Sequence, residues 1–472
     1  MHLPKLLFAG LLLAGCASTS PKDAFSDVAQ SVEARSGKTV RWDQGGDDDK
    51  KIEEAVDRLL AQPLTADSAV QIALLMNPAL RAKLEELSIA QADLVQAGLL
   101  KNPVFSVGRT AWEMEHISPN LFVTVEQDFL DILTLPLRKR VARSQLEATK
   151  LEVGDEVLEL AAHVRAAYYT AQAAKQVAAM RQLVEEAATT TAELAQQQYA
   201  AGNMNDLNLQ TQLGQSAQAT LERKRADGEA AVAREELNKA MGLWGKRTAW
   251  TLPTRLPELP KEEPPLDRLE LVAMQKRLDI AAGNRNVEAM KHALSLAKTT
   301  RWTGTVNVAV ETGRLRHNRR FSFGPSVGIE IPLFDQRQAQ IAKLEAHTRQ
   351  AENELNALAI DVRADVRSAH ARVVTARNVV LDYTKVVVPT RERIVKYSQE
   401  QYDAMLLGVY QLIQAKQNEY DGYRETIEAL RDYWIARSDL ERAVGTRVGT
   451  AAVPAPEPAK TVAPPPAHEH HH

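Results

Sequence analysis

The last five residues are the ones whose type and spacing could do chemistry most directly. They are His468-Glu469-His470-His471-His472. Neutral imidazoles are good ligands for copper, zinc, nickel and cobalt, and a mobile segment can gather several of them around one ion. His468, His470, His471 and His472 are therefore candidate metal ligands. The alternative interpretation is that these histidines are the remnant of a purification tag.

Evidence for an enzyme is weak elsewhere in the chain. The sequence contains no phosphate-binding loop and no dinucleotide fingerprint. The other histidines are scattered without ligand spacing, and the many carboxylates fall at helical surface spacing. The formal net charge is −3, with 25% charged residues, which gives no basic surface for nucleic acid. We therefore expect neither an enzyme nor a nucleic-acid-binding protein, and no cofactor.

Cys16, the only cysteine, stands where an N-terminal apolar run ends. Residues 6–13 form that run, and Leu13-Ala14-Gly15-Cys16 closes it. The run is too short to span a bilayer, so we interpret residues 1–15 as a lipoprotein signal peptide. The four residues resemble the bacterial lipobox, which implies that Cys16 carries lipid at the mature N-terminus. Ala17 after it favours the outer membrane. The alternative is an ordinary signal peptide with an incidental cysteine.

Two proline-rich segments divide the chain. Residues 251–267 separate two long bodies, 64–250 and 268–449, and residues 450–472 form a proline-rich tail that ends in histidines. We expect this tail to be extended and disordered. Residues 16–63 are polar, and we interpret them as a lipidated N-terminal linker or as an ordered wrap whose path the sequence does not fix.

The two long bodies repeat each other in sequence. Leu146-Glu147-Ala148 recurs as Leu344-Glu345-Ala346, and Gln198-Tyr199 recurs as Gln401-Tyr402. The offset between the copies drifts only from 198 to 203. Chance matching of alanine-rich helices would not keep the offset so constant, so we predict an internal two-fold repeat.

Each body has the same predicted order of elements. The first has a helix over 64–99, strands near 103–110 and 120–129, and, after Pro136, long helices ending at Tyr199 and Met241. The second has a helix over 268–299, strands 303–312 and 321–331, and long helices ending near Tyr402 and Ala443, with a kink at Pro389. The stretch from Arg138 to Tyr199 would span roughly 90 Å. A helix of that length must lie in a coiled coil, against its own partner helix and other subunits.

The two strands predicted in the second body alternate apolar and polar side chains. Val306, Val308 and Val310 share one side, as do Phe321, Phe323, Val327, Ile329 and Ile331. This fits tilted membrane strands with an apolar side to lipid and a polar side to a lumen, although a half-buried soluble sheet shows the same alternation. Four strands leave open edges, which hydrocarbon does not tolerate. A barrel must therefore close across subunits, and three chains give twelve strands.

Each body also carries a tyrosine-centred motif between its two long helices: Tyr199-Ala-Ala-Gly202 followed by Leu207-Asn-Leu209, and Tyr402-Asp-Ala-Met405 followed by Gln411-Leu-Ile-Gln414. Together with the features above, these motifs resemble the TolC-like outer-membrane efflux proteins over residues 64–446. The resemblance implies a mainly α fold with membrane β-strands. Long antiparallel coiled-coil helices then form a periplasmic tunnel, and four strands per chain form a trimeric twelve-stranded β-barrel. Residues 64–250 and 268–449 become the two efflux-protein repeats.

The resemblance places the helix-to-helix turns at the periplasmic tip of the tunnel, where they dock on an adaptor. The candidate docking residues are Gly202, Asn203, Met405, Leu406, Leu407 and Gly408. Family members often carry acidic gate residues nine and twelve positions after the tip tyrosine. Asn208, Thr211, Gln411 and Gln414 stand there in this chain. They predict a polar, uncharged constriction, or else solvated positions of an ordinary coiled coil. Met405 stands where glycine is common, which leaves the geometry of the second turn open.

The implied function is that of the outer-membrane channel in a tripartite efflux system. Its partners would be two further copies of the chain, a periplasmic adaptor protein, a proton-driven inner-membrane pump of the RND type and outer-membrane lipid. The histidine tail favours heavy-metal cations as cargo, and drugs or other organic compounds are the alternative. A periplasmic structural coiled-coil lipoprotein is the alternative of another class, but it would leave the strands and the repeat without a purpose.

Overall fold

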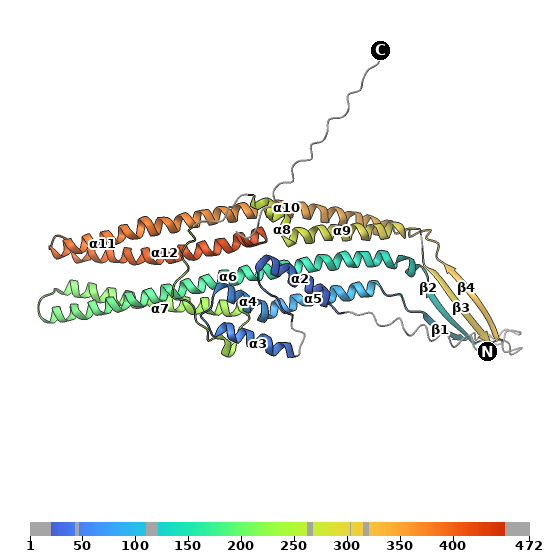
Figure 1. Ribbon diagram of the computed structural model, residues 1–472, viewed down its shortest axis with the longest axis horizontal. Coiled ribbons are helices and arrows are strands. Elements are labelled where there is room, and N and C mark those ends of the chain that lie inside the picture. Colours follow the sequence, from blue (N-terminus) through green and yellow to red (C-terminus); the bar gives the residue numbers. More distant parts are fainter. Residues whose placement is uncertain are drawn as a thin grey trace, which may run out of the picture.

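The chain forms a long, narrow molecule with strands at one end and helical hairpins at the other (Figure 1). The computed structural model describes residues 20–42, 47–109, 121–261, 268–302, 304–314 and 321–448. The predicted class, mainly α with four antiparallel strands, is confirmed. The longest helix, α6 (Leu130–Ala200), has 71 residues, which corresponds to about 105 Å. Within the described ranges, none of the helices is both long and apolar enough to cross a bilayer.

The first half contains two short helices where one was expected. These are α4 (Ala66–Met76) and α5 (Pro78–Ala97), and α6 is followed by α7 (Asp206–Met241). The break lies at Asn77 because a residue before proline disfavours the helical backbone. The Asn77 side chain accepts hydrogen bonds from the backbone N–H groups of Ala79 and Leu80 and so caps α5. It also donates to the carbonyl of Ala240, 2.8 Å away at the end of α7.

The second half has the same order of elements. Its helices are α8 (Leu269–Lys276), α9 (Leu278–Thr299), α10 (Gln338–Asp382), α11 (Val388–Asp403) and α12 (Val409–Val444). Here the first helix breaks at Arg277, whose guanidinium donates to the carbonyl of Ala443 at 3.4 Å. Between α10 and α11 a π-helical turn, Tyr383–Val387, precedes Pro389. Because proline lacks an N–H and crowds the carbonyl four residues back, the wider turn lets the helix continue.

The predicted start of the first long helix was wrong. We expected the helix to follow Pro136, but α6 begins at Leu130 and contains Pro136. The reason is that Asp128 caps the N-terminus of the helix, ahead of the proline. Its carboxylate accepts hydrogen bonds from the N–H groups of Leu130 and Asp131 at 3.1 and 3.3 Å. Asp131 in turn forms an ion pair with Arg138 at 2.9 Å across the proline.

The four strands form one antiparallel sheet in the order β1-β2-β3-β4. They are β1 (Val104–Arg109), β2 (Leu121–Asp128), β3 (Val306–Arg314) and β4 (Phe321–Ile329). The register sets Phe105 opposite Val125, Val125 opposite Val310, and Val308 opposite Val327. Since side chains alternate along each strand, one face is mainly apolar, although Arg109, Gln127 and Thr312 also share it. It carries Phe105, Val107, Leu121, Val123, Val125, Val306, Val308, Val310, Phe323, Val327 and Ile329.

The opposite face of the sheet is small and polar. It carries Ser106, Thr124, Glu126, Asn307, Glu311, Ser326 and Gly328, which confirms the predicted alternation. Phe122 is the large exception on this face. Its ring lies over Gly108, so a β-carbon at that position would displace the ring.

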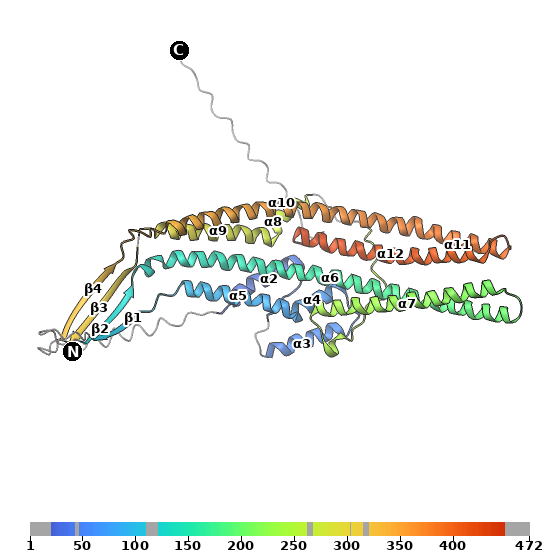
Figure 2. The ribbon, with the colours of Figure 1, turned by 180° about the vertical axis from the view of Figure 1, so that it is seen from behind.

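The segment that we interpreted as a linker or an ordered wrap contains two helices, α2 (Lys22–Ser36) and α3 (Asp47–Leu60). They lie along the middle of the first-half helices with α4 and α5 (Figure 2). Val28 and Val32 of α2 are almost fully buried in one core cluster with Val153 and Val157 of α6. This burial shows that the segment wraps on the body.

Contacts between α6 and α12 join the two halves. The rings of Tyr169 and Trp434 stack with centroids 5.5 Å apart. Arg165 pairs with Glu441 at 3.4 Å, and Glu159 pairs with Arg442 at 2.8 Å. The first half and the second half each keep their own main cluster of buried residues, and the partly buried Trp434 packs against both clusters.

Asp155 on α6 lies in this junction and generates a pH prediction. Burial raises its pKa to about 6, the Asp279 carboxylate adds to the rise, and Arg277 and Arg442 oppose it. Since the folded chain holds the proton more tightly than the unfolded chain, stability falls as the pH rises from about 4 through 6. Asp155→Asn should remove this cost, on the order of 2 kcal/mol at pH 8.

The test compares thermal unfolding midpoints of the wild-type protein and Asp155→Asn in detergent at pH 8 and pH 4.5. The variant should gain stability at pH 8 and clearly less at pH 4.5. Glu156→Gln, at an exposed neighbouring position on the same helix, is the control. An equal gain at both pH values would contradict the account.

Candidate functional site

The two helical hairpins end in turns of the same geometry. In the α6–α7 turn the N–H groups of Gly202 and Asn203 donate to the carbonyls of Tyr199 and Gln198, both at 2.9 Å. In the α11–α12 turn Met405 and Leu406 donate to Tyr402 and Gln401, again at 2.9 Å. Gly202 has a φ of 74° and Met405 a φ of 59°. Met405 therefore adopts the left-handed conformation that glycine provides in the other turn, which settles the geometry left open by the sequence.

The tip carries a group of large exposed apolar side chains. Met405 is 94% exposed, Leu406 79% and Leu207 75%. Leu407 is half-buried, whereas Gly202, Asn203 and Gly408 are exposed. Exposed apolar clusters of this kind are typical of surfaces that bind another protein. The six residues predicted to dock thus lie together in two turns at the end of the molecule, seen at the left of Figure 1.

A cavity of about 690 Å³ lies between the two hairpins, near their tips. Residues from α6, α7, α11 and α12 line it. Beside a similar number of aliphatic side chains, its polar lining consists mostly of neutral amides: Gln198, Asn208, Gln212, Gln215, Gln218, Gln399, Gln414 and Gln417. Charged side chains, among them Arg181, Glu222 and Asp421, also line the cavity.

The structure brings together two of the four predicted gate residues. Asn208 and Gln414 line this cavity from opposite hairpins, whereas Thr211 and Gln411 do not. The Thr211 hydroxyl donates back to the carbonyl of Leu207 at 2.7 Å. The Gln411 side-chain oxygen lies beside Gly408, 2.8 Å from where a β-carbon would stand. In a single chain, Gln411 therefore covers the turn.

Arg181 links the hairpins beside the cavity, and sequence reasoning did not identify it. It pairs with Glu222 of α7 at 2.6 Å and with Asp421 of α12 at 3.4 Å. Its side chain is only 12% exposed. No short motif marks this arginine, because its two partners lie 41 and 240 positions away along the chain.

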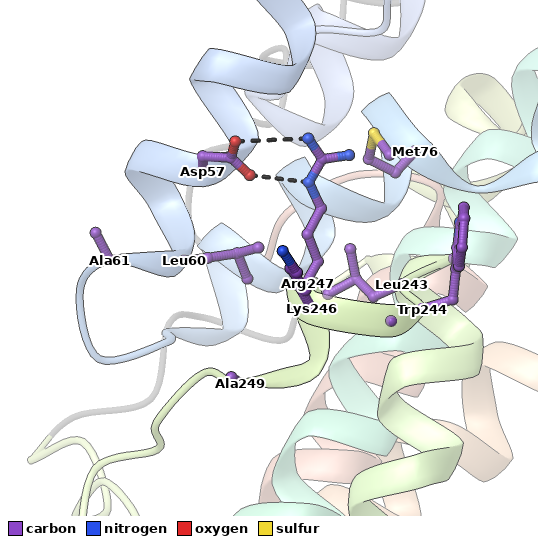
Figure 3. Close-up of a pocket in the computed structure, with 11 residues that line it drawn as sticks. Asp57, Leu60, Ala61, Met76, Leu243, Trp244, Lys246, Arg247 and Ala249 are labelled. Carbon is purple, nitrogen blue, oxygen red and sulfur yellow. Dashed lines mark hydrogen bonds and ion pairs between the residues drawn. The ribbon is translucent and has the colours of Figure 1, made fainter.

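A second hollow, of about 600 Å³, lies where α3 meets the end of α7 (Figure 3). Arg247 pairs there with Asp57 at 2.9 Å and with Glu53 at 3.3 Å. These contacts hold α3 against the segment after α7, so the arginine has a structural role. Trp244 at the rim is 83% exposed.

Two short segments match the consensus sequences of catalytic motifs. Gly324-Pro-Ser-Val-Gly328 matches the pattern of a serine nucleophile turn, but it lies within strand β4 and not at a strand-to-helix turn. His468-Glu469-His470-His471-His472 matches a zinc-protease pattern, but it lies outside the described residues, as does Cys16. Among the described residues, no group of three or more His, Cys, Asp or Glu side chains is placed to hold a metal ion.

The left-handed conformation of Met405 generates a prediction about the tip. A residue with a β-carbon loses about 1–2 kcal/mol of stability in this conformation. Glycine avoids that strain, but its greater conformational entropy in the unfolded chain offsets part of the gain. Met405→Gly should therefore stabilise the turn by about 1 kcal/mol or less. Hydrogen exchange of the Leu406 amide should slow. The reciprocal control, Gly202→Ala, should speed exchange of the Asn203 amide. Faster exchange in Met405→Gly would contradict the assignment.

Comparisons with known proteins give the same architecture. Residues 69–243 match the family model described as outer membrane efflux protein. No curated protein sequence matches the chain. A membrane protein from Pseudomonas aeruginosa is 19% identical with a TM-score of 0.68, over 80% of this chain and 93% of that one. The outer membrane protein VceC from Vibrio cholerae is 16% identical with a TM-score of 0.68, over 81% and 96% of the two chains.

The CmeC outer membrane channel from Campylobacter jejuni is 13% identical with a TM-score of 0.70, over 82% of this chain and 87% of that one. Identities this low establish a shared fold, and the family match establishes the kinship in the first half. Residues 69–243 are therefore similar to the outer membrane efflux protein family, and the fold shared with VceC and CmeC extends over 81% and 82% of this chain.

Proposed function

We propose that three copies of this chain form an outer-membrane channel that exports substrates delivered from the periplasm. The observation that carries the proposal is the sheet at one end of the helical body. Its apolar face is exposed, with Phe105 at 66%, Phe323 at 75% and Ile329 at 66%. Lipid is the environment that such a face requires, and the polar face then lines a lumen.

Closure across subunits follows from the outer strands of the sheet. In the described part of the chain, β1 pairs only with β2, and β4 pairs only with β3. Open edges are excluded from hydrocarbon, so β1 of one copy would pair with β4 of the next. Three copies give a twelve-stranded barrel, and the helices of the three copies continue it as a tunnel. The proposed repeats are residues 64–250 and 268–449, joined by residues 251–267.

We infer that the channel works with a periplasmic adaptor and an inner-membrane pump of the RND type. The exposed apolar tip, from Gly202 to Asn203 and from Met405 to Gly408, is the docking surface in this proposal. In this proposal the cavity behind the tip forms part of the closed entrance. Asn208 and Gln414 line it, and Thr211 and Gln411 lie on the same two helices, α7 and α12.

The membrane end of the chain completes the proposal. Residues 1–15 are removed as a signal peptide, Cys16 carries the lipid anchor on the periplasmic side, and residues 17–63 lead to the body. The tail, residues 450–472, offers His468, His470, His471 and His472 to metal ions.

Heavy-metal cations are the cargo that we propose. The polar face of the sheet supports cation passage, since it carries Glu126 and Glu311 and, within the described strand residues, no lysine or arginine. Carboxylates lining a pore attract cations and repel anions. Drugs and other organic compounds remain the second candidate, favoured by the breadth of a twelve-stranded lumen.

The charge argument predicts the selectivity of the pore. Glu126→Gln/Glu311→Gln removes six carboxylates from a trimer, so the pore should become less selective for cations. In planar bilayers with a salt gradient, its reversal potential should shift away from the value of a cation-selective pore. Glu156→Gln, on the exposed surface of α6, is the matched control. Unchanged selectivity in an intact trimer would show that the polar face does not line the pore.

The cargo is tested in cells. Deletion of the gene should sensitise cells to one or more divalent or cuprous ions, and the full chain should restore tolerance. A chain without residues 468–472 should restore it less well if the tail serves export. Unchanged metal tolerance together with new sensitivity to drugs would move the cargo to organic compounds. If the purified protein showed no conductance in planar bilayers, the proposed channel itself would be refuted.

A further inference from the structure

A cavity of about 570 Å³ lies at the junction of the two halves, away from the tip and from the sheet. Helix α6 contributes Arg165, Tyr169 and Gln172, and α12 contributes Trp434 and Arg437. The segment after α7 and the start of α4 close two further sides. Its volume lies within the range of small-molecule sites.

The lining of this junction cavity is positively charged. Four arginines line it, Arg165, Arg255, Arg437 and Arg447, against two carboxylates, Asp67 and Glu441. Asp67 is shared by Lys38 at 3.3 Å, Arg447 at 3.2 Å and Arg165 at 3.9 Å. Helix α4 also begins here, and its first N–H groups add partial positive charge. This excess of positive charge favours an anion.

Gln172 supplies an independent sign of a ligand. The residue is 2% exposed, and its side-chain N–H donates to the carbonyl of Arg255 at 2.6 Å. Its buried side-chain oxygen has no hydrogen-bond partner among the described residues. Rotating the Gln172 amide by half a turn would place its oxygen against the carbonyl oxygen of Arg255, so the orientation of the amide is fixed. A buried acceptor left without a donor costs about 1–3 kcal/mol, which a donor on a ligand would recover.

Aromatic side chains form the apolar wall beside these groups. Tyr169 is 9% exposed and stacks on Trp434, whose indole N–H donates to the carbonyl of Pro257 at 2.9 Å. The Arg437 guanidinium lies 5.7 Å from the Trp434 ring centroid. These contacts fix the wall and the arginine relative to one another, so the charge is held in place before a ligand arrives.

We propose that the junction cavity binds a small oxyanion that also carries a hydroxyl group, such as hydrogen phosphate or a phosphorylated sugar. The anionic oxygens contact the arginines, and the hydroxyl donates to the side-chain oxygen of Gln172. The site is independent of the channel function, because it uses neither the sheet nor the tip. It joins α6 to α12, so its occupant would hold the two halves of the protein together.

Phosphate and sulfate distinguish this proposal from general screening of charge. At neutral pH hydrogen phosphate carries a hydroxyl donor and sulfate carries none. Titration calorimetry of the full-length protein in detergent, at fixed ionic strength, should show saturable binding of phosphate and at least tenfold weaker binding of sulfate. Glucose 6-phosphate is the second probe, and it shows whether the cavity admits a sugar.

Three variants assign the effect to the cavity. Gln172→Leu should weaken phosphate binding about tenfold, equivalent to about 1.4 kcal/mol, and abolish the preference over sulfate. Arg255→Gln, at an exposed residue that leaves the core intact, should weaken both anions equally. Lys246→Gln, which removes an exposed cation at the hollow of Figure 3, is the matched control and should change neither. Equal affinity for the two anions, or phosphate binding that survives both cavity substitutions, would overturn the proposal.

Discussion

A sheet with an apolar face and unpaired outer edges is the constraint on which the rest of the structure depends. Backbone groups along β1 and β4 need partners, and the face that carries Phe323 and Val327 needs an apolar surrounding. Neither requirement is met by the described residues of one chain. Both are met when the edges of neighbouring copies pair within a bilayer, because closure then removes every edge.

The helical body, like the sheet, leaves apolar side chains that one chain alone does not cover. A helix of 71 residues cannot be buried in one compact core, and apolar side chains stay exposed along the body. Ile89 is 62% exposed, Leu183 67%, Val232 65% and Ile360 64%. Side chains of this kind at intervals along helices are typical of surfaces that face further helices. Neighbouring copies would cover them where the barrel continues into a tunnel.

The sequence was sufficient for features that depend on local patterns and insufficient for those that depend on distant partners. Local sequence patterns predicted all four strands, with clear alternation in the two strands of the second half, and the tyrosine-centred motifs predicted both turns at the tip. The cap at Asp128 and the link from Arg181 to Asp421 were missed, and the path of the wrap of α2 on α6 was left open, because each depends on a contact that no short motif records. Of the predicted gate, the structure brings Asn208 and Gln414 to one cavity, since helical spacing alone does not determine which face of each helix meets the other hairpin.

Covalent cross-linking between β1 and β4 tests the central claim most directly. The chain has a single cysteine, Cys16, so a Cys16→Ser background allows new cysteines to be placed in pairs, one at Ser106 and one at Ser326 or a neighbouring β4 position. If the barrel closes across subunits, oxidation of the purified protein should give disulfide-linked dimers and trimers, and native mass spectrometry should give three chains. Monomers with no cross-link at any tested register would contradict the account.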